Sequence, residues 1–119
     1  MNSQDAASPH DLLVVRPSKW TLVVIVHLRD GTMRFNELRR NMGGVPQKSL
    51  SQTLRELERD GFVTRRAYAT IPPRVEYDLT PLGHELLALA DQFHRFALRH
   101  RPAVEAARQR FDTLDGAAP

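Results

Sequence analysis

Apolar residues in the middle of the chain recur at helical spacing in separate runs. The first run predicts a helix over residues 19–29, which Ser18 can cap and which Gly31 can end. Little of its surface is polar, so we expect a central, buried helix, with a strand as the alternative because several residues are β-branched. The second run predicts a helix over residues 35–42, which stops at two consecutive glycines.

A third helix is predicted between Pro46 and Gly61, with leucines at positions 50, 54 and 57. At about 100° per residue, the side chains opposite these leucines are hydrogen-bond donors. Arginine and lysine can reach guanine O6 and N7, and glutamine can bridge adenine N6 and N7. An ordinary surface helix would show a similar polar face. The position of this helix after a glycine turn, however, favours a role in reading DNA bases. The candidate base-reading residues are Gln47, Lys48, Ser51, Gln52 and Arg55.

A β-hairpin is predicted next. Residues 62–68 are rich in strand formers, residues 69–73 contain two prolines, and residues 74–79 alternate apolar and charged positions. We expect Val75, Tyr77 and Leu79 to face the core. Two helices joined by a glycine turn and followed by a basic hairpin predict a winged helix-turn-helix, a mainly α fold with a small antiparallel β-hairpin wing (α+β). The residues expected on the DNA backbone are Arg34, Asn36, Arg39, Arg65, Arg66 and Arg74.

Thr80 and Pro81 start a last, long helix with a hydroxyl cap and a proline in the first turn. Its apolar residues recur at intervals of four and three, the spacing of a seam that meets another helix. We expect this seam to join the N-terminal apolar segment in a homodimer, with packing inside one chain as the alternative. The expected interface residues are Leu12, Leu13, Leu82, Leu86, Leu89, Phe93 and Phe96.

The length of 119 residues suits one domain. Few apolar residues occur in residues 1–10 and 112–119, which we expect to be flexible tails on either side of a domain spanning residues 11–111. That domain would comprise the winged helix-turn-helix and dimerisation helices at both of its ends. No signal peptide or apolar stretch of roughly 18 residues is present, so we expect a cytoplasmic protein that makes no membrane contact.

Basic residues gather in the predicted DNA-binding stretch. Residues 34–74 hold nine lysines and arginines against four acidic residues, whereas the rest of the chain holds eight against ten. This asymmetry is typical of a phosphate-binding surface and predicts double-stranded DNA as the partner. A winged-helix protein-interaction module and a non-specific nucleoid-type DNA binder are the alternatives. The first should carry an apolar or acidic recognition face, and the second would gain nothing from Ser51 and Gln52 in the groove.

Several kinds of chemistry have no support in the sequence. The chain has no cysteine, which excludes disulfides, thiolate zinc sites and a cysteine redox switch. Its five histidines show no metal-binding spacing, although a pH response stays open. Glycine-rich phosphate loops and nucleophile elbows are absent, so we predict no catalytic residue, no cofactor and no enzyme activity. An unknown small-molecule effector is conceivable beside Trp20, Phe93 and Phe96, although we favour filled core for these rings.

Five strings of residues resemble those of the HxlR-type transcriptional regulators. They are Lys-Trp-Thr at 19–21 and the segments 34–40, 50–57, 72–77 and 79–83, in unbroken order. The resemblance implies a homodimeric regulator, repressor or activator, that binds inverted or direct repeats near promoters and reads bases with residues 46–60. Many members carry a cysteine ahead of the Lys-Trp-Thr string and some sense oxidants or electrophiles with it. Residues 10–15 of this chain hold none, so its regulation is expected to use another signal.

Overall fold

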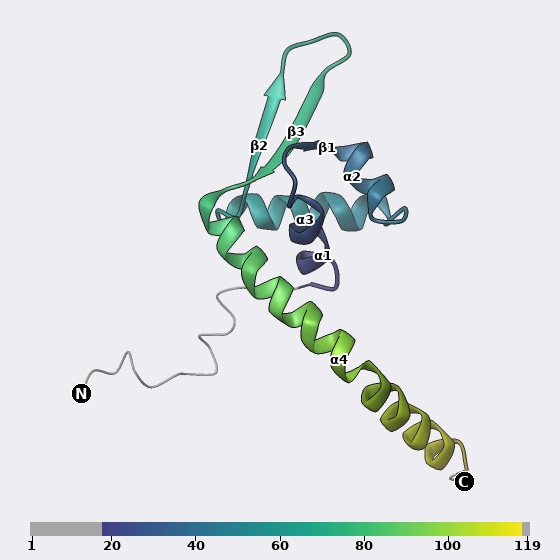
Figure 1. The fold of residues 1–119 in the computed structure, drawn as a ribbon. Helices are drawn as coiled ribbons and strands as arrows, with labels where there is room; N and C mark the ends of the chain where they lie inside the picture. The colour runs from purple at the N-terminus through teal and green to yellow at the C-terminus, as the bar shows by residue number, and fades with distance from the viewer. Residues whose placement is uncertain (1–17, 118–119) are drawn as a thin grey trace, which may run out of the picture.

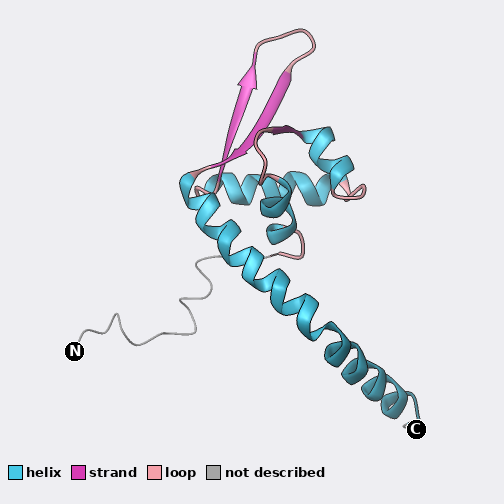
Figure 2. Cartoon of the chain, viewed as in Figure 1, coloured by secondary structure: helices cyan, strands magenta, loops and turns pink. Residues whose placement is uncertain are grey.

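The computed structural model describes residues 18–117, which form a helical body, a projecting hairpin and a long terminal helix (Figures 1 and 2). The predicted N-terminal tail and the predicted interface residues Leu12 and Leu13 lie outside the described residues. The elements in chain order are α1 (Thr21–His27), β1 (Met33–Arg34), α2 (Phe35–Asn41), α3 (Gln47–Arg59), β2 (Val63–Tyr68), β3 (Arg74–Leu79) and α4 (Pro81–Ala117).

Helix α1 is the central helix of the body, as predicted. Its residues Val24 and Ile25, and Leu28 just after it, are fully buried. The helix is two residues shorter at each end than the sequence predicted. The N-cap position belongs to Trp20, while Ser18 orders the preceding turn: its amide donates to the Thr21 hydroxyl at 2.8 Å. End positions of this kind depend on single hydrogen bonds and are poorly encoded in hydrophobic spacing.

The two helices of the helix-turn-helix match the predicted runs closely. Between them, Gly43 and Gly44 have φ values of 80° and 79°, a left-handed backbone that explains why glycines stand there. The Gly44 amide closes the turn by donating to the Arg39 carbonyl at 2.9 Å. In α3, Leu50, Leu54 and Leu57 are buried as predicted.

The predicted hairpin is present but belongs to a three-stranded antiparallel sheet in the order β1-β3-β2. Strand β1 was not predicted, because two residues are too short to show alternation; Met33 pairs with Tyr77. Leu79 is buried and Tyr77 packs against the core, which confirms the predicted inward face at this end of β3. The distal half of the hairpin projects beyond the helices (Figure 2).

The junction between the hairpin and α4 depends on Thr80 and Gly83. The Thr80 hydroxyl accepts a hydrogen bond from the Gly83 amide at 3.0 Å, so it caps α4 as predicted. Gly83 occupies the third helical position, where a capping box would have a glutamate. A Cβ added at Gly83 would lie 2.1 Å from the carbonyl oxygen of Phe62. Close approach of two backbone segments therefore excludes every side chain from this position.

Replacing Thr80 by alanine is expected to lower the free energy of unfolding by about 1–2 kcal/mol, the range for loss of an N-cap. The hydroxyl also donates to the Gly61 carbonyl at 2.6 Å, so its removal affects the end of α3 as well. Urea denaturation followed by circular dichroism measures the change. Thr80→Ser keeps the hydroxyl and should recover most of the loss; equal midpoints for Thr80→Ala and the wild type would show that the cap contributes nothing.

Helix α4 is anchored to the body only through its first turns. Leu86, Leu87 and Ala90 are buried there, whereas every side chain from residue 92 to residue 115, except the half-buried Ala106, is exposed. The radius of gyration of 18.4 Å exceeds the roughly 13 Å of a compact chain of 100 residues, because the far part of α4 projects away from the body (Figure 1).

Two predictions about this C-terminal region are corrected. The expected tail from residue 112 is helical as far as Ala117. It extends the helix that the residues before it form, most of which are good helix formers. Leu86, predicted at the dimer interface, is 6% exposed and belongs to the core of its own chain. Spacing alone could not assign Leu86, because this residue lies at the border between the face of α4 that packs on the body and the exposed apolar face.

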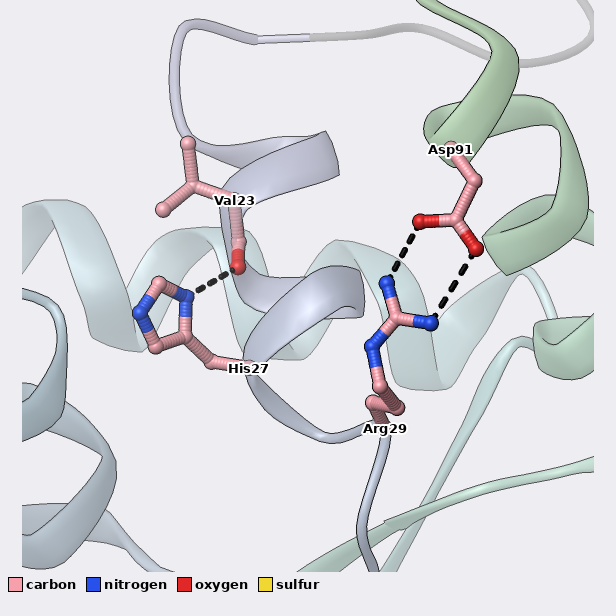
Figure 3. A network of polar contacts seen from close by, with 4 residues as sticks. All are labelled: Val23, His27, Arg29 and Asp91. Atoms are coloured by element: carbon pink, nitrogen blue, oxygen red, sulfur yellow. Dashed lines mark hydrogen bonds and ion pairs between the residues drawn. The ribbon is translucent and has the colours of Figure 1, made fainter. Parts of the chain in front are cut away.

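One ion pair joins the end of α1 to α4 (Figure 3). The Arg29 guanidinium donates from Nη1 to Asp91 Oδ2 at 3.1 Å and from Nη2 to Asp91 Oδ1. These hydrogen bonds hold the pKa of Asp91 below its usual value and raise that of Arg29. On the other side of α1, His27 Nδ1 donates to the Val23 carbonyl at 2.7 Å, since a carbonyl oxygen can only accept.

Candidate nucleic-acid interface

The outward face of α3 carries the predicted base-reading residues. Four of them, Gln47, Lys48, Gln52 and Arg55, are exposed, and Ser51 is half-buried at the edge of the face. The opposite side of α3 packs into the body, with Leu50 at its centre. The helix is thus held by its apolar face and presents amide, ammonium and guanidinium donors to solvent.

Arg59 also belongs to this face and was missed by the sequence analysis. It is exposed and lies about 180° around α3 from Leu50, near Gln52 and Arg55 in projection. The helical projection was available from the sequence, and extending it to the last turn would have found this residue. Gln52 itself is oriented by a hydrogen bond from its Nε2 to Glu56 Oε1 at 3.4 Å.

The start of α2 presents Arg34 and Asn36 to solvent. The Arg34 amide donates to the Glu37 carboxylate at 3.3 Å, which caps the helix and fixes its first turn. Arg39, which we expected on the DNA backbone, is half-buried, and its Nε donates to the Val45 carbonyl at 2.7 Å. This arginine therefore holds the turn before α3, a role that charge and spacing could not reveal.

The wing arginines do not form a single cluster. Arg65 and Arg66 are both exposed, but consecutive strand residues point to opposite faces of the hairpin. Arg66 pairs with Glu76, and Tyr68 pairs with Arg74, so Arg66 and Arg74 share one face while Arg65 lies on the other.

Arg74 is the most constrained of the wing arginines. Its guanidinium carbon lies 4.2 Å from the centre of the Tyr68 ring, and its Nε lies 3.4 Å from Glu76 Oε2. The buried Nε has no hydrogen-bond partner among the described residues. Stacking on the tyrosine holds the guanidinium in place while its terminal nitrogens stay available to an anion.

An open crevice of about 650 Å³ separates α2 from the tip end of β3 in the wing. It brings together Arg34, Asn36 and Arg74, three of the residues that we expect on the DNA backbone, and it adds Arg40, which the sequence analysis missed. Three arginines against one glutamate make the crevice suited to an anionic group. The lining residues are Arg34, Phe35, Asn36, Glu37, Arg40, Pro73, Arg74 and Val75.

Two of the three rings proposed as walls of an effector pocket or as filled core lie outside the core of this chain. Phe93 and Phe96 are 62% and 61% exposed, and Trp20 is partly buried against the core. Within residues 18–117, no three histidine, cysteine or acidic side chains are grouped to hold a metal ion. None of the described helices is sufficiently long and apolar to span a bilayer.

Comparison with known proteins identifies the family. The HxlR-like helix-turn-helix profile matches residues 15–105. The uncharacterised HTH-type transcriptional regulator YtfH of Escherichia coli K12 is 53% identical over 78 residues, which is 62% of either chain, so this chain spans less than two thirds of that relative. YtcD of Bacillus subtilis is 41% identical over 74% of this chain and 70% of its own.

Solved structures agree in fold. A putative transcriptional regulator, ytfH of Salmonella typhimurium, superposes with a TM-score of 0.73 at 41% identity, covering 88% of this chain and 94% of its own. The redox regulator HypR in its reduced form gives 0.74 at 39% identity, covering 83% and 99%. The winged helix-turn-helix fold and the matched sequences agree: the chain belongs to the HxlR-like family of helix-turn-helix transcriptional regulators.

Proposed function

We propose that this regulator binds specific DNA sequences as a homodimer, at repeated sites near promoters, and responds to a signal other than cysteine oxidation. The observation that carries the proposal is the outward face of α3, where Lys48, Gln52 and Arg55 are exposed beside one another. These side chains have the donors that discriminate guanine and adenine in the major groove. With α3 in the groove, its N-terminal residues Gln47 and Lys48 meet the bases first.

Phosphate contacts position this helix. The crevice of Arg34, Asn36, Arg40 and Arg74 fits an anionic oxygen cluster, and Arg65 and Arg66 add exposed positive charge nearer the base of the wing. Such contacts fix the register of a protein on DNA without reading sequence. Arg39 is left out of this set because its Nε already binds the turn before α3.

The homodimer is supported by the second face of α4. Leu89, Phe93 and Phe96 are each about three-fifths exposed, and the same stripe continues through Phe111 and Leu114. It is turned roughly a quarter turn from the face that packs on the body. An exposed apolar stripe of this length is typical of a helix that pairs with another chain. A dimer would place two copies of α3 in successive major grooves, about 34 Å apart.

Two other functions fit less well. A protein-interaction module would be favoured by an apolar or acidic α3 surface, but the exposed residues there are mainly basic and amide side chains. A nucleoid-type binder would share the basic charge but not need glutamine and arginine at groove-facing positions.

Selection of fragmented genomic DNA by the purified full chain, followed by titration of the best fragment at two salt concentrations, tests the proposal. Enrichment of a repeated motif that is bound more tightly than scrambled DNA is the expected result. Binding without sequence preference would point to an architectural protein, and no binding at moderate salt would favour the protein-interaction module.

Single alanine variants should distinguish the residues that read bases from those that contact the DNA backbone. Gln52→Ala and Arg55→Ala are each expected to cost about 1–3 kcal/mol on the selected site and to relax the base preference. Arg65→Ala should weaken all sequences alike and reduce the salt slope by about one. Titrations on operators with single base changes measure both effects. Arg108→Ala, which removes an exposed arginine from the far part of α4, is the matched control; identical behaviour of the three test variants would refute the division.

A further inference from the structure

The Arg29–Asp91 ion pair lies where α4 leaves the body. Ala90 is the last residue of α4 that is buried, and Asp91, next to it, has 28% of its side chain exposed. From residue 92 onward the helix has no buried side chain among those described. The ion pair therefore joins the body to α4 at the point where the buried residues of α4 end (Figure 3).

The body side of this link is well packed. Arg29 follows Leu28, which is fully buried, at the end of α1. Helix α1 packs against both α3 and α4, so it connects the recognition helix to the long helix. Two parallel hydrogen bonds between a planar guanidinium and a carboxylate restrict orientation as well as distance.

Stability alone does not account for this pair. Its side chains are 43% and 28% exposed, and exposed ion pairs contribute little to folding. Nearby charges offer each partner a substitute: Arg95 and His94 lie close enough to Asp91 to lower its pKa, and Asp30 lies close enough to Arg29 to raise its pKa. Losing the pair should therefore leave the body folded while freeing the direction of α4.

The direction of α4 at the ion pair affects the position of its distal part, because the helix continues far beyond Asp91. Pro102, the proline inside α4, comes 11 residues after Asp91, which is about 16 Å of helix at 1.5 Å per residue. A rotation of about 12° at Asp91 would move that position by roughly 3.4 Å, the step between neighbouring base pairs. If a second copy binds along the distal stripe, the angle at Asp91 is transmitted to the distance between the two recognition helices.

We propose that Arg29 and Asp91 are positioning residues that set the angle of α4 and thereby the half-site spacing that the dimer accepts on DNA. This inference rests on the proposed homodimer and its repeated site. The pair itself touches no DNA; it acts through α1 and α4.

The test uses the full chain and a series of DNA duplexes that carry two copies of the selected half-site, with the spacer changed one base pair at a time. The wild type should prefer one spacing. Arg29→Ala should reduce its discrimination against neighbouring spacings by about fivefold or more, the lower end of coupling between distinct sites. Its affinity for a single half-site should stay within about twofold of the wild type, since α3 is unchanged.

Two further variants make the result specific. The exchanged pair Arg29→Asp with Asp91→Arg should restore sharp spacing discrimination. Arg101→Ala breaks the Arg101–Glu105 ion pair, which is exposed and lies within α4, and it should change nothing.

The outcomes separate the two proposals. If Arg29→Ala keeps the spacing preference of the wild type, or loses single-site and paired-site affinity equally, the positioning role is wrong while the dimeric function stands. If the wild type itself binds every spacing alike, the proposed dimer on repeated sites is wrong, and the inference that rests on it falls too. Asp91→Asn provides an independent variant that keeps the side-chain shape, and it should match Arg29→Ala.

Discussion

Replacing Phe93 and Phe96 together by alanine is expected to convert the proposed homodimer to a monomer. Both rings project from α4 with about three-fifths of their surface exposed in the single chain, and burying two aromatic side chains is among the largest contributions an interface can gain. Light scattering should report the mass falling from twice 13.6 kDa to 13.6 kDa. Far-ultraviolet circular dichroism should stay close to that of the wild type, since neither ring belongs to the core.

Loss of the proposed homodimer should greatly lower the affinity for a paired DNA site. Two linked recognition helices bind a paired site with an avidity about 10²–10⁴ times that of one. We therefore expect the double variant to lose at least about 100-fold in affinity for the paired site while keeping its affinity for one half-site.

Leu98 provides the matched control for this variant. It is 60% exposed, as Phe93 and Phe96 are, but lies about 140–160° around α4 from both. Leu98→Ala should leave mass and paired-site affinity unchanged. An unchanged mass for the phenylalanine variant would remove these rings from the interface, and equal dissociation by both variants would show that exposed apolar area, rather than the stripe, drives association.

Hydrophobic spacing predicted the elements that bury a face. The leucines of α3 are a clear case, because a repeat of four and three leaves only one way to orient the helix on a core. The hairpin was equally readable from its alternation at Tyr77 and Leu79, and the glycine turn from its two consecutive residues. Opposite faces of these same elements then yielded the exposed candidates for DNA contact, including Lys48, Gln52 and Arg55.

Features that depend on one tertiary contact were not predictable. Strand β1 exists because Met33 meets Tyr77 across the chain, and Arg39 is withdrawn from the surface by a single carbonyl. Leu86 fits both the core and the exposed stripe by spacing, and only the position of α1 decides between them. The helix beyond residue 111 was not predictable from its own residues, because aspartate, threonine and glycine are poor helix formers; it extends the helix formed by the residues before it.

Gly83→Ala is expected to be strongly destabilising. Alanine favours a helix over glycine by about 1 kcal/mol, so propensity alone predicts a gain. The new Cβ would lie 2.1 Å from the Phe62 carbonyl oxygen and 3.2 Å from a methyl group of Leu79. That carbonyl already accepts the Thr80 amide at 3.1 Å, which limits its freedom to retreat. Overpacking against backbone outweighs propensity, and we expect a net loss of about 2 kcal/mol or more in the free energy of unfolding.

Urea denaturation of Gly83→Ala and of Ala88→Gly distinguishes sterics from helix propensity. Ala88 is exposed on α4, so its replacement should cost only the propensity difference of about 1 kcal/mol. If Gly83→Ala proves more stable than the wild type, the Phe62 segment can move and the close approach is not required. If it is destabilised as expected but, while folded, binds a half-site normally, this glycine serves folding alone. The resemblance of residues 79–83 to the HxlR-type regulators would then come from the junction between wing and helix. The resembling segments in α2 and α3, in contrast, include the residues proposed to contact DNA.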